Sequence, residues 1–299
     1  MSRILLASLI LISTVVLGQD LLSQLQQSDS KEKEFVFQTF KGSRVVNGHS
    51  VETRAKGELE FIISHRFGRI NSGAYNFFGW DAAYIRFGLE YGLTSKLGVG
   101  LGRSSFNKIY DGYLKYMALR QSSGGGSPVT ITALGSMALQ TDVSKLYPNQ
   151  VIDRKDVPLT NKLSYVTQLL IARKFSPIFS MQLTPSYMFA NRIVPGQENN
   201  SQLAVGVSGR MKLNGSISLN GEYFYRANSP AASTYHDMVA LALDIETGGH
   251  VFQLIFSNTQ SMIDRTFAWQ TKGNFFKGDI HFGFNITRSF QLKKTKPKA

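Results

Sequence analysis

The sequence predicts an all-β fold: a transmembrane, antiparallel, up-and-down β-barrel of about twelve strands. Three observations lead to this prediction. Short segments alternate apolar and polar residues, the connections between them alternate in length, and aromatic residues gather at the segment ends. A period of two residues places one set of side chains on each face of a strand, so each segment has an apolar face and a polar face.

The clearest segment is 279–290 (DIHFGFNITRSF), near the end of the chain. Phe282 and Phe284 lie on one face, and His281 and Asn285 lie on the other. In a membrane barrel the apolar face meets lipid and the polar face lines the lumen. The position of this segment suits a last strand that pairs with the first and closes the barrel.

Eleven earlier segments show the same alternation, most of them about ten residues long, which is the length that a tilted strand needs to cross a bilayer. One of them carries Gly98, Gly100 and Gly102 on a single face, which predicts a bend or bulky side chains packed against that face. The eleven segments are 57–67, 81–91, 96–103, 112–121, 128–140, 162–173, 178–188, 202–211, 216–225, 236–245 and 250–257.

The connections between these segments differ in length at the two ends of the predicted barrel. Short turns at the periplasmic end and longer outer loops are typical of outer-membrane barrels, and both termini are then periplasmic. A soluble secreted barrel or sandwich would bury the same apolar faces inward, but it does not require this asymmetry. The long connections are 68–80, 104–111, 141–161, 189–201, 226–235 and 258–278, and the short ones are 92–95, 122–127, 174–177, 212–215 and 246–249.

Aromatic residues at segment ends suit the two interfacial girdles of a membrane barrel. Within the long connection 258–278, residues 262–269 (MIDRTFAW) have the pattern of a short amphipathic turn, although a solvated loop is the simpler interpretation. The girdle candidates are Tyr75, Phe77, Phe78, Trp80, Tyr91, Tyr187, Tyr223, Tyr225, Trp269, Phe275 and Phe276.

The chain divides into four parts. Residues 1–19 have a basic start at Arg3, a short apolar core and the small residue Gly18, which predict a cleavable signal peptide. The apolar run is shorter than the roughly 20 residues of a transmembrane helix. Residues 20–56 are predicted to be a periplasmic lead-in or plug segment, residues 57–290 the outer-membrane barrel, and residues 291–299 a basic periplasmic tail.

Composition limits the possible partners. The 299 residues carry a net charge of +13 and no cysteine, which excludes disulfides, thiol catalysis and cysteine metal sites. An exported basic chain is expected to meet outer-membrane lipid, lipopolysaccharide or a polar or anionic small solute rather than nucleic acid. The sequence leaves the oligomeric state open.

The sequence contains no catalytic motif, and we predict no enzyme, no cofactor and no metal. His65 and His281 fall in the first and last segments and would be neighbours across the seam of the barrel. A metal site there is one interpretation, and two ordinary strand histidines are the simpler one.

Charged residues on the predicted lumen face are the candidate functional residues. They either form an internal ion-pair network that fills the barrel or line a pore that selects solutes by charge. They are Glu60, Arg66, Arg86, Glu90, Lys115, Arg210, Glu222 and Asp244.

The N-terminal third carries several distinctive runs: 46–52 (VNGHSVE), 64–68 (SHRFG), 77–81 (FFGWD), 100–105 (GLGRSS) and 110–116 (YDGYLKY). In these runs the chain resembles an uncharacterised family of membrane-bound bacterial β-barrel proteins, a domain of unknown function. The resemblance implies an outer-membrane barrel over most of the mature chain. It transfers no activity and no functional residues, because the family has none assigned.

These observations predict an outer-membrane barrel that acts as a small channel or as a binding and translocation protein for a polar solute. A structural or interaction barrel with a plugged lumen is the alternative. An outer-membrane lipid-modifying enzyme is the third possibility, since serine and histidine on barrel strands can serve catalysis without a short motif.

Overall fold

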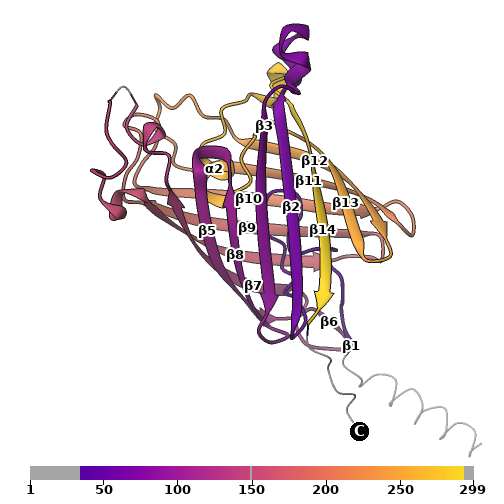
Figure 1. Cartoon of the computed structure of the whole chain (residues 1–299). Helices are drawn as coiled ribbons and strands as arrows, with labels where there is room; N and C mark the ends of the chain where they lie inside the picture. Colours follow the sequence, from indigo (N-terminus) through magenta and orange to yellow (C-terminus); the bar gives the residue numbers. More distant parts are fainter. Residues whose placement is uncertain (1–33, 149, 293–299) are drawn as a thin grey trace, which may run out of the picture.

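A computed structural model describes residues 34–148 and 150–292 of the chain. Twelve antiparallel strands close into one barrel, in which β14 (His281–Gln291) pairs with β2 (Glu58–Arg69) (Figure 1). The other strands are β3 (Ala83–Gly92), β4 (Leu97–Ser104), β5 (Ile109–Leu119), β7 (Thr130–Gln140), β8 (Leu163–Lys174), β9 (Phe179–Ala190), β10 (Ser201–Lys212), β11 (Ile217–Arg226), β12 (Met238–Thr247) and β13 (His250–Ser257).

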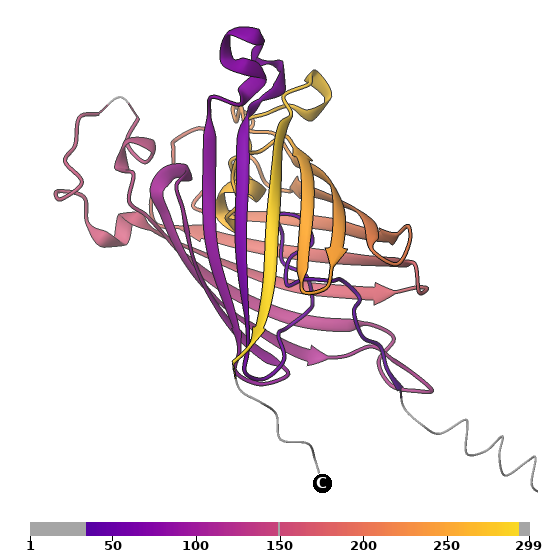
Figure 2. The ribbon, with the colours of Figure 1, turned by 45° about the vertical axis from the view of Figure 1, so that its right-hand side comes forward.

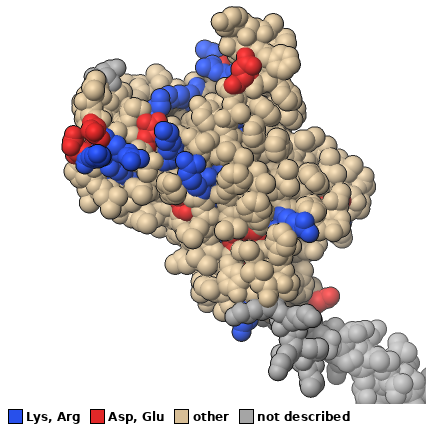
Figure 3. All heavy atoms as spheres, in the orientation of Figure 1, with Lys and Arg blue, Asp and Glu red and all other residues tan. Residues whose placement is uncertain are grey.

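The side chains alternate between the two faces of the wall as predicted. Leu101, Leu114 and Leu203 point outward and are 65%, 56% and 49% exposed, whereas Lys115 points inward and is buried. Apolar side chains on the outside and polar ones inside confirm the membrane-barrel prediction, and the soluble sandwich with inward apolar faces is wrong. Much of the visible outer surface carries no charged side chain, and Lys and Arg gather toward the loops (Figure 3).

One predicted connection is wrong. The long loop expected at 104–111 is short, because β5 begins at Ile109. Ile109 is buried on the inner face, and Asp111 faces the lumen two positions further along. The alternation of this strand therefore extends back beyond the predicted start at residue 112.

Long connections lie at one end of the barrel and carry the short helices, while short turns lie at the other (Figure 2). At the short-turn end, β1 (Glu34–Phe35) pairs with β6 (Ser122–Ser123) outside the barrel. No helix in residues 34–148 and 150–292 is long and apolar enough to cross a membrane. The short helices are η1 (Ile70–Ser72), η2 (Ala74–Gly79), η3 (Phe106–Lys108), η4 (Val143–Lys145), η5 (Leu159–Lys162), α2 (Asp264–Trp269) and η6 (Phe275–Lys277).

Aromatic side chains do gather on the outer surface near the long loops. Phe67 packs against Trp80 and Phe282, with ring centroids 4.6 Å and 5.9 Å apart. Trp269 was also predicted in this girdle, and that prediction is wrong because Trp269 lies inside the barrel, fully buried.

The predicted signal peptide (1–19) and most of the predicted tail (291–299) lie outside the described residues.

Two parts of the described chain occupy the lumen. Residues 36–57, here called the lumenal segment, enter from the short-turn end, and α2 enters from the long-loop end (Figures 1 and 2). Every residue of α2 is buried, so the solvated loop expected for residues 262–269 is wrong there. An apolar cluster inside the barrel joins Val46 and Val51 of the lumenal segment to Phe267 and Trp269 of α2.

Candidate functional site: the occupied lumen

The lumenal segment turns back sharply at residues 44–49. Val45 N–H donates to Gly48 O at 2.9 Å, and a β-bridge joins Arg44 to His49. A hairpin this short leaves main-chain groups without partners at its tip. Because such groups are costly to bury unpaired, the wall of the barrel must supply the partners.

Glu222 on β11 supplies acceptors for three of these groups. Its carboxylate accepts from the main-chain N–H of Val46 at 2.9 Å, of Asn47 at 2.8 Å and of Gly48 at 3.1 Å. Hydrogen bonds to an ionised carboxylate are among the stronger ones in proteins. The turn therefore holds the Glu222 carboxylate of the wall in a nest of main-chain donors.

Further wall side chains pair with the carbonyl and amide groups on either side of the turn. They come from strands on opposite sides of the barrel, so the segment is held across the lumen. The pairs are Asn285 Nδ2 to Val46 O at 3.1 Å, Gln253 Nε2 to Val45 O at 2.8 Å, Thr132 Oγ1 to Val51 O at 2.7 Å, Val51 N to Gln182 Oε1 at 2.9 Å and Gln182 Nε2 to His49 O at 2.7 Å.

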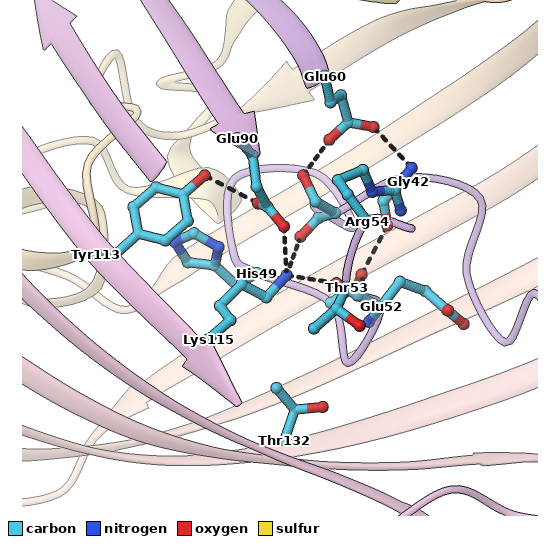
Figure 4. Close-up of polar contacts among 12 residues, drawn as sticks. Gly42, His49, Glu52, Thr53, Arg54, Glu60, Glu90, Tyr113, Lys115 and Thr132 are labelled. Carbon is cyan, nitrogen blue, oxygen red and sulfur yellow. Dashed lines mark hydrogen bonds and ion pairs between the residues drawn. The ribbon is translucent and has the colours of Figure 1, made fainter. Parts of the chain in front are cut away.

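A charged cluster on β2, β3 and β5 holds the two ends of the segment (Figure 4). Lys115 Nζ donates to Ser43 O at 3.1 Å and to Glu52 O at 2.6 Å, and lies 3.7 Å from Glu90 Oε1. Glu90 also accepts from the Tyr113 hydroxyl at 2.9 Å. Lys115 thus joins the wall to the chain on both sides of the turn.

Glu60 on β2 completes this cluster. It lies 3.1 Å from Arg54 Nη1 and accepts a short hydrogen bond from the Ser43 hydroxyl. Both partners belong to the lumenal segment. Three of the predicted lumen charges, Glu60, Glu90 and Lys115, therefore meet in one network with the segment.

Arg86 and Arg66 also face the interior. Arg86 forms a two-pronged ion pair with Asp111, at 3.1 Å and 2.5 Å. Arg66 donates to Asn47 Oδ1 at 2.8 Å and to Asn285 Oδ1 at 3.1 Å.

The remaining predicted charges lie nearer the short-turn end. Arg210 Nη2 lies 2.8 Å from Glu246 Oε1, and Glu246 also pairs with Lys41 of the lumenal segment at 2.7 Å. Asp244 accepts from Gln253 Nε2 at 2.6 Å. All eight predicted side chains are buried inside the barrel.

The glycine face of β4 makes room for the charged cluster. A Cβ at Gly100 would lie 2.1 Å from the Tyr113 ring, and one at Gly102 would lie 2.2 Å from Arg86 Nη2. The predicted bulky neighbours are therefore present, and they come from the adjacent strands β5 and β3. Larger residues at Gly100 and Gly102 would displace the partners of Glu90 and Asp111.

The lumenal segment and α2 meet at one polar contact. His49 Nε2 lies 3.3 Å from Asp264 Oδ2, and both side chains are buried. Burial lowers the pKa of His49 to about 4, and the nearby Arg44 adds to this effect. The pKa of Asp264 is lowered to about 2 beside His49 and Arg44, despite its burial. At neutral pH the contact joins a neutral imidazole to a carboxylate.

α2 is otherwise held by one side of the wall. Phe267 packs edge-on against Phe224 of β11, with ring centroids 5.3 Å apart. Arg265 lies 3.7 Å from the buried Glu198 and donates to Gln140 at 3.3 Å.

Sequence reasoning missed several members of this site. Asp111 was placed in a loop, although its alternation with Tyr113 and Lys115 was a usable signal. Glu198 and Asp264 lie in long connections, where no periodicity assigns a face. Their roles depend on how the loops fold inward.

The predicted histidine pair is not a site. His65 stacks on Phe284, with ring centroids 5.0 Å apart, and also contacts Phe67. His281 is buried, and its Nδ1 lies 3.0 Å from Phe67 O. Within the described part of the chain, no group of three or more His, Asp or Glu could hold a metal ion.

Residues 40–290 match the family described as "Membrane bound beta barrel domain (DUF5777)", and the chain belongs to this family. It is a domain of unknown function. No curated protein matches the sequence.

Several solved barrels have a similar architecture. The NanC porin is 10% identical, with 78% of this chain and 100% of the porin covered and a TM-score of 0.48. The KdgM porin is 8% identical, with 77% and 98% covered and a TM-score of 0.45. An outer membrane channel from Pseudomonas putida F1 is 11% identical, with 80% and 98% covered and a TM-score of 0.44. Similarity at this level extends to the barrel architecture alone.

Proposed function

We propose that the protein is an outer-membrane channel for a small polar solute, closed by its own lumenal segment, which acts as a plug. The observation that carries this proposal is the way the segment is held. Its turn forms neither helix nor strand, and its main-chain groups pair with wall side chains such as Glu222 and Gln182. Bonds to water can replace such bonds, since each contributes only about 0.5–1.5 kcal/mol net, or about 1.5–3 kcal/mol where the partner is charged.

Removing the segment would leave a polar passage. Glu60, Glu90, Lys115, Arg66 and Glu222 would then line the open side of the lumen, as in pores that select solutes by charge. Twelve strands enclose a lumen between the filled interior of eight-stranded barrels and the open channel of sixteen-stranded porins. A small solute suits that size.

The proposal includes the route to the membrane. Residues 1–19 act as a cleavable signal peptide, residues 20–56 as the periplasmic lead-in and plug, and residues 291–299 as a periplasmic tail. Outer-membrane lipid and lipopolysaccharide then surround the apolar belt of the barrel.

A permanently plugged interaction barrel is the second candidate. The apolar cluster that includes Phe40, Val46, Phe224 and Trp269 favours it, because these side chains pack like the core of a soluble domain. In that case the loops or the lead-in would recruit a partner, and the lumen would never conduct.

Single-channel recording in a planar bilayer tests the proposal. We expect the wild-type protein to stay mostly closed with brief openings, and Glu222→Gln to open more often, because the amide accepts fewer of the N–H bonds of the turn. Asp156→Asn, which removes an exposed carboxylate on an outer loop, is the matched control and should behave as wild type.

Silence from both wild type and Glu222→Gln, in protein shown to be folded and inserted, would support the permanently plugged barrel instead. A wild-type channel that stays open would contradict the role of the segment as a plug.

A further inference from the structure

A cavity of about 290 Å³ opens at the long-loop end of the barrel, beside the chain that follows α2. A second cavity of about 260 Å³ adjoins it and shares Arg69, Tyr84, Gln260 and His281. Together they have the size of a site for one small molecule. The proposed plug closes the lumen on the far side of α2, so this cavity is accessible while the barrel is closed.

The larger cavity is lined by cationic and no anionic side chains. Arg69, Lys145 and Lys272 line it, and no Asp or Glu is among its lining residues, all of which are described. Arg69 is partly neutralised by Asp279 at 3.0 Å. Among the described residues, no carboxylate forms an ion pair with Lys145 or Lys272.

The buried acid that contacts the lining residue Gln270 is already paired. Glu198 is 2% exposed, accepts from Gln270 at 2.8 Å and lies 3.7 Å from Arg265. One carboxylate, Asp81, lines the smaller cavity together with Arg69. The larger cavity is therefore the cationic end of the pair, and the smaller cavity carries both signs of charge. A ligand with its negative charge toward Lys145 and Lys272 fits this distribution.

Neutral groups in the same cavity suit hydroxyls. Asn107, Gln260 and Gln270 present amides, which can both donate and accept. Tyr235 adds a phenol, and burial together with Glu198 raises its pKa to about 12, so it remains a donor at neutral pH. Phe106, edge-on to Tyr84 at 5.0 Å, adds an apolar face.

We infer that this outer cavity binds a small anionic solute rich in hydroxyl groups, with its carboxylate against Lys145 and Lys272. A sugar acid has this chemistry. The cavity is formed by residues of the loops and of the inner wall, such as Lys272 and His281, so the ligand is a free solute and not the head group of a surrounding lipid.

The inference rests on the proposed function, because it names the solute class that the channel would carry. Its test is separate, since binding at an outer cavity is measured on the closed barrel at equilibrium and needs no conductance. A barrel that binds the solute and never conducts would refute the channel alone.

Isothermal titration of the full mature protein in detergent, with galacturonate and with galactose, tests the inference. Galacturonate carries a carboxylate at the position where galactose has a hydroxymethyl group. We expect galacturonate to bind at low salt and galactose to bind at least tenfold more weakly, because galactose lacks the carboxylate that would form charge-assisted hydrogen bonds with the two lysines. Raising the salt from about 50 mM to about 500 mM should weaken galacturonate binding further.

The variant pair Lys145→Gln with Lys272→Gln should weaken galacturonate binding by roughly tenfold. Lys155→Gln with Lys277→Gln is the matched control, because it removes the same charge from exposed loop positions outside the cavity and should leave the affinity unchanged.

Three results would overturn the inference. They are equal affinity for the two sugars, an unchanged affinity in the first variant pair, and no binding of galacturonate up to about 10 mM by protein whose barrel is shown to be folded. Adding lipopolysaccharide to the titration tests the source of the ligand: competition at the cavity would assign it to a lipid anion instead.

Discussion

The two sides of the lumen wall differ in chemistry. On β2, β3 and β5 many inward side chains are charged and paired, for example Arg86 with Asp111 and Lys115 with Glu90. On β8 to β13 many are apolar, including Leu170, Met188, Phe224 and Ile255. The lumenal segment therefore lies between a polar surface and an apolar one, while α2 packs mainly against β8, β10, β11 and β12 of the apolar side.

This difference indicates where a passage would open. Cavities of about 560 Å³ and 30 Å³ lie between the lumenal segment and the wall, and both are lined by Glu60, Val251 and Thr287. They follow β2, β13 and β14 rather than the apolar cluster. We expect water and solute to pass on this side, with the apolar side as the support for α2.

Phe224→Ala should have the largest effect on stability, because it removes a large buried side chain from the apolar side. Phe224 packs against Phe267 and lies within 3.3 Å of a Cβ placed at Gly48. Loss of a buried phenylalanine costs about 3–5 kcal/mol. We expect a lower urea midpoint for barrel unfolding and loss of protease protection for both α2 and the lumenal segment. An unchanged midpoint would show that the apolar side contributes little.

Arg86→Met should come next, because it breaks a pair on the charged side and leaves Asp111 buried alone. Such a change costs about 3–5 kcal/mol, whereas replacing both partners by apolar groups is often close to neutral. We therefore expect Arg86→Met to lower the free energy of unfolding and the double variant with Asp111→Leu to recover most of it. A double variant as unstable as Arg86→Met alone would mean that this ion pair itself stabilises the barrel, and additive losses would mean that the two side chains do not act as a pair.

Acid should weaken the contact between His49 of the lumenal segment and Asp264 of α2. In the closed barrel the pKa of His49 is about 4, against an ordinary value of 6.5. Between these values a released segment binds a proton at His49 that the closed one does not, so the contribution of His49 to the stability of the closed state falls by up to about 3 kcal/mol as the pH falls from 6.5 toward 4. The groups facing His49 are Asp264, Arg44, Lys115 and Tyr113, and Asp264 stays ionised in this range.

The measurement is the open probability of single channels at pH 7.5 and pH 5. We expect more frequent opening at pH 5 for wild type and a much smaller change for His49→Gln, which cannot gain the proton. The same pH response in both proteins would show that protonation of His49 does not cause the opening.

Thr132→Val should have the smallest effect. It removes one hydrogen bond, from Thr132 Oγ1 to Val51 O at 2.7 Å, at a cost of about 1 kcal/mol. We expect a modest rise in open probability with no change in the unfolding midpoint. A loss of folded protein would show that this bond matters more to the barrel than to the segment.

Much of the barrel was predictable because the alternation of each strand is local. Residues 250–257 were predicted as a strand and form β13 with the same ends. The ends of strands are harder to predict than their middles. The predicted segment began at residue 112, so Asp111, the partner of Arg86, was left out of the strand.

The occupied lumen was less accessible to sequence reasoning. Burial of Trp269 reversed its predicted place at the membrane interface, because nothing local shows that its loop turns inward. Glu222 was placed on the lumen face, but its three donors lie more than 170 positions earlier in the chain, at Val46 to Gly48. Long-range contacts of this kind have no periodic signal.

The most direct test of the central claim uses the absence of cysteine in the chain. Val51→Cys with Thr132→Cys would introduce two thiols where the lumenal segment meets β7. After oxidation is verified by electrophoresis, the same protein is recorded in a planar bilayer before and after reduction. We expect a silent oxidised barrel that conducts once it is reduced. Equal conductance in the two states would show that the lumenal segment does not control the passage.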